Sequence, residues 1–195
     1  MYKKIHLDTD YQLFLTSPSP EATTCIKHQT YELTDIHEKF GGFPKTYCFE
    51  NTKIHQTWYD ETSCDYAELG KKLGIEVVTV STIMQPPGNT IPLHRDTFYQ
   101  IKKKFPENKK PIVRCNIYLE DWKIGHFLQY NDNIDTHWKQ GDGHMWDSEV
   151  LHIGANSGME NKYTLQISFS CVGIREIPST VLWGRIILFF SFNPI

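Results

Sequence analysis

The sequence predicts a mainly β protein with flanking helices, folded as a double-stranded β-helix, which is the jelly-roll type of barrel. Two observations lead to this fold class. From Pro111 onward, short strand-like segments follow one another at close spacing with turn residues between them, as in sandwiches and rolled barrels. Before them, residues 75–84 are rich in β-branched side chains and predict a further strand. A helix from the first third of the chain completes the prediction.

The first third of the chain gives weaker signals. The apolar run Tyr11-Gln12-Leu13-Phe14-Leu15 predicts a strand. Two proline- or glycine-rich breaks, at residues 17–20 and 41–44, interrupt regular structure. The helix is predicted over residues 63–73, where Ser63 can cap its start and Gly74 can end it. Its apolar face consists of Tyr66, Leu69 and Leu73.

The later strands are predicted from runs of β-formers between turn residues. They cover residues 112–119, 126–130, 138–146 with a turn at 141–143, 151–153 and 163–172. We therefore expect one domain over residues 1–195, with a support region (1–74), a jelly-roll core (75–172) and an apolar tail (173–195). The tail is too short and interrupted to span a membrane, and we expect it to pack on the domain or on a second copy, forming a homo-oligomer.

Composition narrows the choice of function. With 195 residues and 39% hydrophobic residues, the chain can bury a sizeable core. Its net charge of -3 makes nucleic acid and anionic lipid unlikely partners. The five cysteines include no C-x-x-C pair, which argues against a disulfide framework. The start of the chain has no apolar run of signal-peptide length, so we expect a cytoplasmic protein with reduced thiols.

The central motif is a tight turn at Pro87-Gly88 that leads into His94 and Asp96. In an extended segment, residues two apart point to the same side, so both side chains can reach one metal. The pattern alone is weak, because about one His-x-acid is expected by chance in a chain of this composition. A second match, His6-Leu7-Asp8, lacks the preceding strand and turn. We take it as the chance match.

A third ligand could come from His126, His137, His144 or His152. Context favours His152, which follows a glycine-containing turn and precedes a long strand. Together, His94, Asp96 and His152 would form the facial triad of two imidazoles and one carboxylate that non-haem Fe(II) oxygenases use.

The strand after His152 adds a possible anion site. Lys162, Thr164 and Gln166 alternate along it and share one face. A cation with a hydroxyl two residues further suits a carboxylate held inside a barrel. Asn116, on the same strand face as Arg114, is either a partner of the site or a polar plug in the barrel; the sequence leaves both open.

Residues 78–170 resemble the 2-oxoglutarate/Fe(II)-dependent dioxygenase superfamily. The run Thr82-Ile83-Met84-Gln85-Pro86-Pro87-Gly88 resembles, with one extra residue, a Ser/Thr-Ile-Met-x-Pro-Gly run of the aspartyl/asparaginyl β-hydroxylase-like group. The strand Val113–Leu119 resembles the arginine strand of that group. Its Trp…Gly…Asp run before the distal histidine is echoed by Trp138, Gly141, Trp146, Asp147 and His152.

The resemblance implies Fe(II) on His94, Asp96 and His152, with ascorbate as reductant. It implies 2-oxoglutarate on Lys162, with help from Arg114 and Thr82. In the β-hydroxylases the distal cation is usually arginine and the first motif often lacks the carboxylate. A lysine with a full His-x-Asp is closer to the prolyl 4-hydroxylases. We therefore expect hydroxylation of an unactivated C–H bond of an amino-acid side chain, peptidyl or free, with 2-oxoglutarate converted to succinate.

Two rival functions stay open. One is a cupin-like module that binds a metal or ligand on the same barrel without oxygenase activity. The other is a nucleic-acid demethylase of the same superfamily, suggested only by the lysines of residues 97–111. Those lysines indicate either a basic lid that favours an acidic substrate or, as is usual for charge runs, a solvated loop or short helix.

Overall fold

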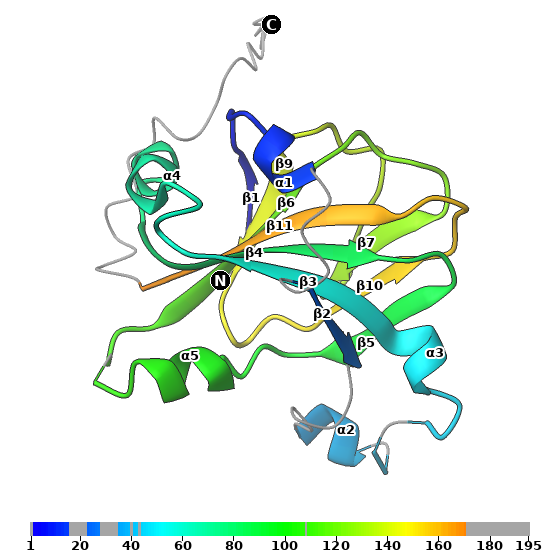
Figure 1. Ribbon diagram of the computed structural model, residues 1–195. Helices are drawn as coiled ribbons and strands as arrows, with labels where there is room; N and C mark the ends of the chain where they lie inside the picture. Colours follow the sequence, from blue (N-terminus) through cyan, green and yellow to red (C-terminus); the bar gives the residue numbers. More distant parts are fainter. Residues whose placement is uncertain are drawn as a thin grey trace, which may run out of the picture.

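The computed structural model describes residues 2–15, 23–27, 35–39, 41–42, 44–107 and 109–170. They form two antiparallel sheets (Figure 1). The larger sheet has the strand order β1-β9-β6-β11-β4-β3-β2. Its strands are β1 Tyr2–His6, β9 Asp142–Trp146, β6 Ile112–Tyr118, β11 Lys162–Ser170, β4 Glu76–Gln85, β3 Lys53–Tyr59 and β2 Thr23–Lys27.

The smaller sheet has the order β5-β10-β7-β8. Its strands are β5 Asn89–His94, β10 His152–Asn156, β7 His126–Tyr130 and β8 Asn133–Asp135. The helices are short: α1 Gln12–Leu15, α2 Asp35–Lys39, α3 Phe49–Thr52, α4 Tyr66–Leu73 and α5 Tyr99–Lys104. This arrangement confirms the predicted mainly β jelly-roll class with flanking helices.

The strand predicted at Tyr11–Leu15 is wrong, because a turn of helix, α1, occupies this segment. Asp10 provides the reason: its Oδ1 accepts the N–H of Gln12 at 2.9 Å, as a capping carboxylate does at a helix start. The N–H groups of Phe14 and Leu15 then both donate to the carbonyl of Tyr11, at 3.0 and 3.1 Å. Local capping overrides the strand propensity of these residues.

The predicted central helix is present as α4, although its cap differs. Asp65, not Ser63, accepts the N–H of Glu68, while Ser63 belongs to the preceding turn with Asp60. The helix ends at Gly74 as predicted, because the left-handed φ of 67° there suits a residue without a side chain.

The main apolar core lies on the face of the large sheet that is turned away from the small sheet. Alternate residues of β6 and β11 point to this side, and α1 and α4 cover it (Figure 1). The cluster includes Phe14, Leu69, Leu73, Val113, Cys115, Ile117, Leu165 and Ile167. Because this core stabilises the sheet from outside, the inner face is free to carry polar side chains.

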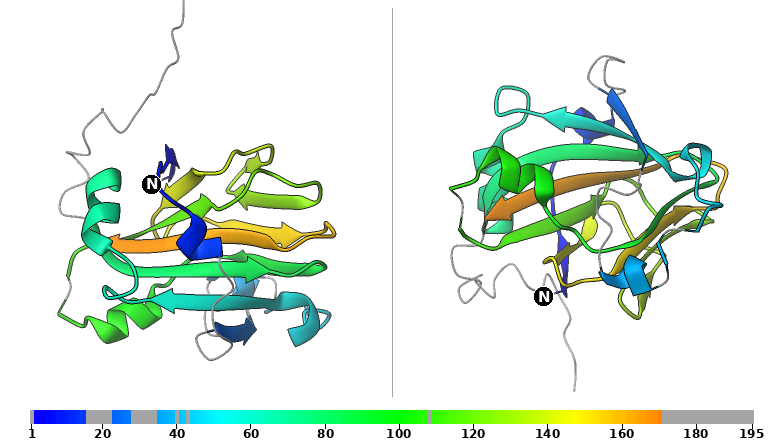
Figure 2. Two further views of the ribbon diagram at one scale, coloured as in Figure 1. Left: turned by 45° about the horizontal axis from the view of Figure 1, so that its top comes forward. Right: turned by 90° about the horizontal axis from the view of Figure 1, so that it is seen from below.

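A second, aromatic cluster lies on the inner side at one end and includes Tyr118, Tyr130, Trp138 and Trp146. The rest of the inner face lines a cavity between the sheets. Figure 2 shows the strands of the two sheets from two further directions. The predicted tail at 173–195 and the break at 17–20 lie outside the described residues. Among the helices that are described, none has the length and apolarity needed to cross a membrane.

Candidate metal centre

The structure brings His94, Asp96 and His152 together at one end of the cavity. One potential ligand atom from each lies within 4.8 Å of the others, and all three side chains are buried. The Pro-Gly turn supports this position: Gly88 has a left-handed φ of 76° and leads directly into β5. His94 ends β5 and His152 begins β10, and the two residues are paired across the strands.

Both imidazoles are oriented by the same kind of hydrogen bond. Nδ1 of His94 lies 2.8 Å from the Pro92 carbonyl, and Nδ1 of His152 lies 3.0 Å from the Val150 carbonyl. A backbone carbonyl requires Nδ1–H, so each Nε2 keeps its lone pair for a metal. Burial, with a smaller effect from His94, lowers the pKa of His152 to about 3, so its ring is neutral at physiological pH.

Asp96 is held through one carboxylate oxygen. Its Oδ2 accepts the Trp146 indole N–H at 2.9 Å and lies 3.4 Å from Nε of Arg114. Burial would raise the pKa of Asp96, but Arg114, the two imidazoles and the indole N–H outweigh it and lower the pKa to about 2. Oδ1 has no hydrogen bond within the described residues, which leaves it available as a ligand atom.

Lys162 lies in the same cavity and is also buried. Its ammonium group donates to the carbonyls of Ala155 and Phe127, at 3.0 and 3.1 Å. No carboxylate in the described part of the chain pairs with it, and burial lowers its pKa to about 7. Two of its three N–H groups are therefore used by backbone, and one is left for a ligand.

The face that the sequence assigned to Lys162 is correct, since Thr164 and Gln166 line the cavity beside it. Asn116 also lines it, and its buried Oδ1 has no hydrogen-bond partner among the described residues. Such an unsatisfied acceptor is unusual in a packed interior and is expected where a ligand binds.

Thr82 does not belong to this cavity. Its neighbours Ile83 and Gln85 line it instead, while the Thr82 hydroxyl lies 3.4 Å from the Tyr59 hydroxyl on the opposite face of the sheet. The prediction failed because it rested on a resemblance of sequence, which does not fix which face of β4 points into the cavity. Gln85, which the sequence analysis missed, donates from the cavity wall to the carbonyls of Asn89 and Gly154, at 2.9 and 3.1 Å.

Arg114 lines the cavity at the end remote from Lys162. It is paired with Ser168, six residues beyond Lys162 on β11. At about 3.3 Å per residue, this places the two backbone positions roughly 20 Å apart along the strand. Arg114 lines the same cavity as Lys162, as expected, and its Nε contacts Asp96. That it assists Lys162 at one carboxylate stays a prediction.

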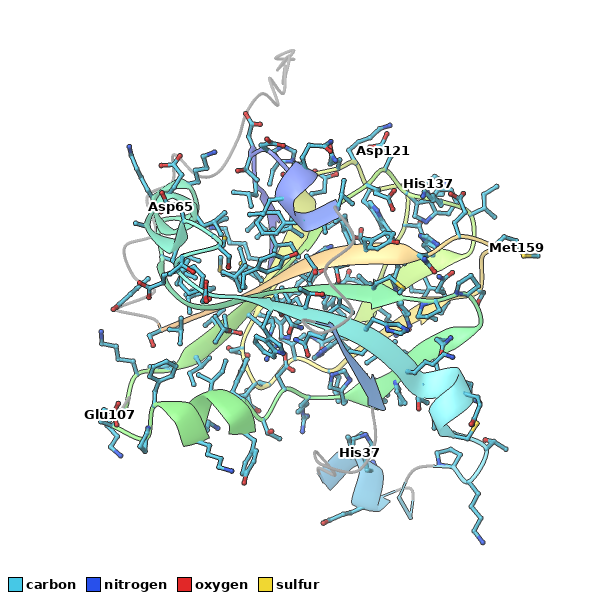
Figure 3. All side chains as sticks on the ribbon, viewed as in Figure 1. His37, Asp65, Glu107, Asp121, His137 and Met159 are labelled. Atoms are coloured by element: carbon cyan, nitrogen blue, oxygen red, sulfur yellow. The ribbon has the colours of Figure 1, made fainter. Side chains whose placement is uncertain are left out.

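The other candidate histidines have different partners. Nε2 of His126 lies 3.0 Å from the Glu160 carbonyl, and Nε2 of His144 lies 2.5 Å from Oδ2 of Asp135. His137 stacks on Trp122, and Figure 3 shows it at the periphery of the molecule. None of the three joins a potential metal group in the part of the chain described.

The lysine-rich insertion forms α5 and the turn after it. Its residues Phe98, Tyr99 and Ile101 line the cavity. The lysines Lys102, Lys109 and Lys110 line a separate hollow together with Asp147 and Glu149. Figure 3 shows Glu107, at the tip of this segment, on the outer edge of the molecule. The short-helix interpretation therefore holds, and the lysines with described side chains form no basic lid over the metal centre.

Comparisons with known proteins give only distant similarity. No protein-family model matches the chain, and no curated protein matches it. Among solved structures, it is similar to a Pseudomonas putida prolyl-4-hydroxylase, with 16% identity, a TM-score of 0.46, and coverage of 77% of this chain and 93% of the other. It is also similar to a predicted oxalate decarboxylase from Thermotoga maritima, with 15% identity and a TM-score of 0.40. That alignment covers 61% of this chain and 82% of the other. A third similar structure is a 2OG-Fe(II) oxygenase family member from Burkholderia pseudomallei, with 11% identity and a TM-score of 0.41. The alignment covers 60% of this chain and 66% of the other.

Proposed function

We propose that this protein is an Fe(II)- and 2-oxoglutarate-dependent dioxygenase that hydroxylates an unactivated C–H bond, with an amino-acid side chain, peptidyl or free, as acceptor. The observation that carries the proposal is a pair of features in one cavity. The first is the buried set His94, Asp96 and His152. The second is Lys162, a buried cation without an acidic partner in the described chain. A metal and a dicarboxylate would satisfy both.

The donor set fits Fe(II). Two neutral imidazole nitrogens and one carboxylate oxygen occupy one side of the ion and leave its other positions open for cosubstrate and dioxygen. Bound Fe(II) would supply the activation of dioxygen, with 2-oxoglutarate losing carbon dioxide to give succinate and the acceptor gaining one oxygen atom. The chain keeps His94 and His152 in the required tautomer and fixes Asp96 through Trp146.

Lys162 would hold the distal carboxylate of 2-oxoglutarate through its remaining N–H. Gly154 keeps this end of the cavity open, because a Cβ there would lie 2.8 Å from the Leu128 side chain and 3.5 Å from the Lys162 ammonium. Thr164 is two residues further on the same face and offers a hydroxyl to the same carboxylate. Since Asp96 fills the carboxylate position of the triad, no halide site is vacant and hydroxylation is the expected outcome.

Neither of the two rival functions accounts for the buried Lys162 or for the position of the lysines near α5. A cupin-like binding module has no need of a buried, unpaired lysine in addition to a metal, because such a cation destabilises the fold unless a ligand compensates it. A nucleic-acid demethylase would be expected to use the lysines of α5 and of the turn after it for phosphate contacts. Lys102, Lys109 and Lys110 lie instead in a hollow that also contains Asp147 and Glu149.

Metal-ligand variants test the assignment. His94→Ala, Asp96→Ala and His152→Ala should each reduce Fe(II) retention at least about tenfold, as loss of one ligand of three requires. His137→Ala is the matched control, since this histidine stacks on Trp122 and should leave retention unchanged. Iron retention in His152→Ala at the parental level, with loss in His126→Ala or His144→Ala, would show that the wrong histidine was chosen.

Product analysis tests the reaction. With Fe(II), ascorbate and 2-oxoglutarate, mass spectrometry of amino acids and peptides should detect a gain of one oxygen atom matched by succinate. A chlorinated product, or no succinate with any acceptor and with none, would contradict the proposed function.

A further inference from the structure

At the end of the cavity remote from Lys162, one guanidinium is only partly used. Arg114 contacts Asp96 through Nε, and its guanidinium carbon lies 5.2 Å from the centre of the Phe98 ring. Neither terminal nitrogen of Arg114 has a hydrogen bond within the described residues, although only 13% of the side chain is exposed. The edge of the guanidinium that can bind a carboxylate through two parallel hydrogen bonds is thus free inside the cavity.

With Fe(II) and 2-oxoglutarate bound, the cavity would have one net positive charge. Among its described lining residues, Lys162 and Arg114 each carry a positive charge and Asp96 a negative one, while the two imidazoles are neutral when they bind metal. Fe(II) would add two positive charges and 2-oxoglutarate two negative charges. One net positive charge would remain in the cavity, and a ligand carboxylate at Arg114 would neutralise it.

Two exposed aromatic side chains line the same cavity. Trp58 on β3 is 48% exposed and Tyr99 on α5 is 57% exposed. Aromatic groups that are both solvent-exposed and cavity-lining commonly provide contact area for a ligand. Because they come from different parts of the chain, they can contact one ligand from more than one direction.

The strand register relates Trp58 to Arg114. Trp58 is paired with Ser81, Ser81 with Gln166, and Gln166 with Asn116, which is two residues from Arg114 on the same face of β6. Three strand spacings, roughly 14 Å, therefore separate the backbone positions of Trp58 and Asn116 across the sheet. The surface between them carries uncharged hydrogen-bonding groups, since Gln56 donates to Ser81 at 2.9 Å and to Gln166 at 3.4 Å.

We propose that the acceptor substrate is a small carboxylate with an apolar or aromatic body, whose carboxylate binds the terminal nitrogens of Arg114 and whose body contacts Trp58 and Tyr99. This inference rests on the proposed function, since the charge balance includes Fe(II) and 2-oxoglutarate. It replaces the acidic substrate that a basic lid would favour with a carboxylate recognised inside the cavity. Arg114 is thereby a substrate-binding residue rather than a cosubstrate ligand.

The test compares carboxylates with their amides under anaerobic conditions. The probes are 3-phenylpropionate, N-acetylphenylalanine and N-acetylleucine, each paired with the corresponding amide. Loading with Fe(II) and saturating 2-oxoglutarate is measured first, and probe binding is then followed by calorimetry. The parent protein should bind the carboxylate of at least one pair about tenfold or more tightly than its amide, as expected for a charge-assisted, two-point contact.

Three variants separate the contributions. Arg114→Met should bring the carboxylate-to-amide ratio of affinities to about one, and Arg114→Lys, which keeps the charge near Asp96, should reduce it. Trp58→Ala alters a half-exposed side chain and should weaken both members of a pair by a similar factor. Lys103→Ala, an exposed position of the insertion, is the control and should change neither.

Failure of this inference can be told from failure of the proposed function. If the parent protein does not take up Fe(II) and 2-oxoglutarate, the proposed function is wrong. The charge balance, which includes both, is then wrong as well. If loading is complete but no carboxylate binds more tightly than its amide, or if the preference survives Arg114→Met, the substrate assignment alone is overturned.

Discussion

Lys162 is the residue whose position is most difficult to explain without a ligand. A buried ammonium with only carbonyl partners loses hydration that two hydrogen bonds replace in part. Its pKa of about 7, lowered by burial, expresses this loss. A dicarboxylate bound beside it would restore the charged form, so cosubstrate binding should be coupled to protonation of this single group.

This coupling predicts a pH dependence. In the ligand-free protein, Lys162 loses its proton as the pH rises through about 7. An anion favours the protonated form, so binding takes up a proton and the apparent affinity for 2-oxoglutarate should fall about tenfold per pH unit above that value. Calorimetry from pH 6.5 to 9 in buffers of different ionisation enthalpy measures both the affinity and the proton. Constant or rising affinity over this range would rule out the assignment.

Two substitutions at the same position sharpen the test. Lys162→Arg stays charged throughout this range and should give a pH-independent affinity if the longer side chain is accommodated. Lys162→Ala should weaken 2-oxoglutarate binding by orders of magnitude while iron stays bound, because leaving one member of a buried charged pair alone costs about 3–5 kcal/mol. Unchanged affinity in Lys162→Ala would count against the role of this residue.

For single residues, the sequence predicted the site correctly where the spacing along a strand determines which side chains share a face. His94 and Asp96 converge because they are two apart next to an extended strand, and Lys162 and Thr164 share a face for the same reason. Thr82 was misassigned because the direction of a face depends on which layer packs against it. The contact between Arg114 and Asp96 depends on the pairing of distant strands, which one sequence does not contain.

Among the elements, β4, β6 and β11 were predictable from their runs of β-forming residues, whereas β3 and β5 were not. β3 carries buried Gln56 among apolar residues, which obscures its alternation. β5 contains Pro92 and begins directly after the Pro-Gly turn, so no strand was predicted there. It nevertheless forms an edge of the small sheet, where a missing N–H is tolerated. In both strands, the residues that obscured the pattern are compatible with a sheet that serves a binding cavity.

A substitution in helix α4 tests whether the outer core contributes to stability without affecting metal binding in the cavity. Leu73 is almost fully buried against the outer face of the large sheet. Leu73→Ala should lower the free energy of unfolding by about 2–5 kcal/mol in urea denaturation, whereas Lys71→Ala, at an exposed position of the same helix, should change it by less than about 0.5 kcal/mol. Fe(II) affinity of folded Leu73→Ala should equal that of the parent; a loss of affinity would show that the outer core also positions the metal ligands.

Over the whole molecule, the two faces of the large sheet carry different tasks. The outer face holds the apolar core beneath α1 and α4. The inner face carries Lys162 and Arg114 and lines the cavity together with the metal ligands, of which His94 and His152 lie on the small sheet. The fold class was predictable because it follows from local patterns of strands and turns. The division of labour between the faces was not, because it depends on how those strands pair and on which layer covers each side.

The most direct test of the central claim is an anaerobic titration of the Fe(II)-loaded protein with 2-oxoglutarate, followed by visible absorption. A weak charge-transfer band should appear and saturate at one 2-oxoglutarate per iron, and it should be absent from the Asp96→Ala protein and shifted to much higher concentrations in Lys162→Ala. Tight Fe(II) binding with no band and no heat of 2-oxoglutarate binding would contradict the claim and favour a metal-binding module without oxygenase activity.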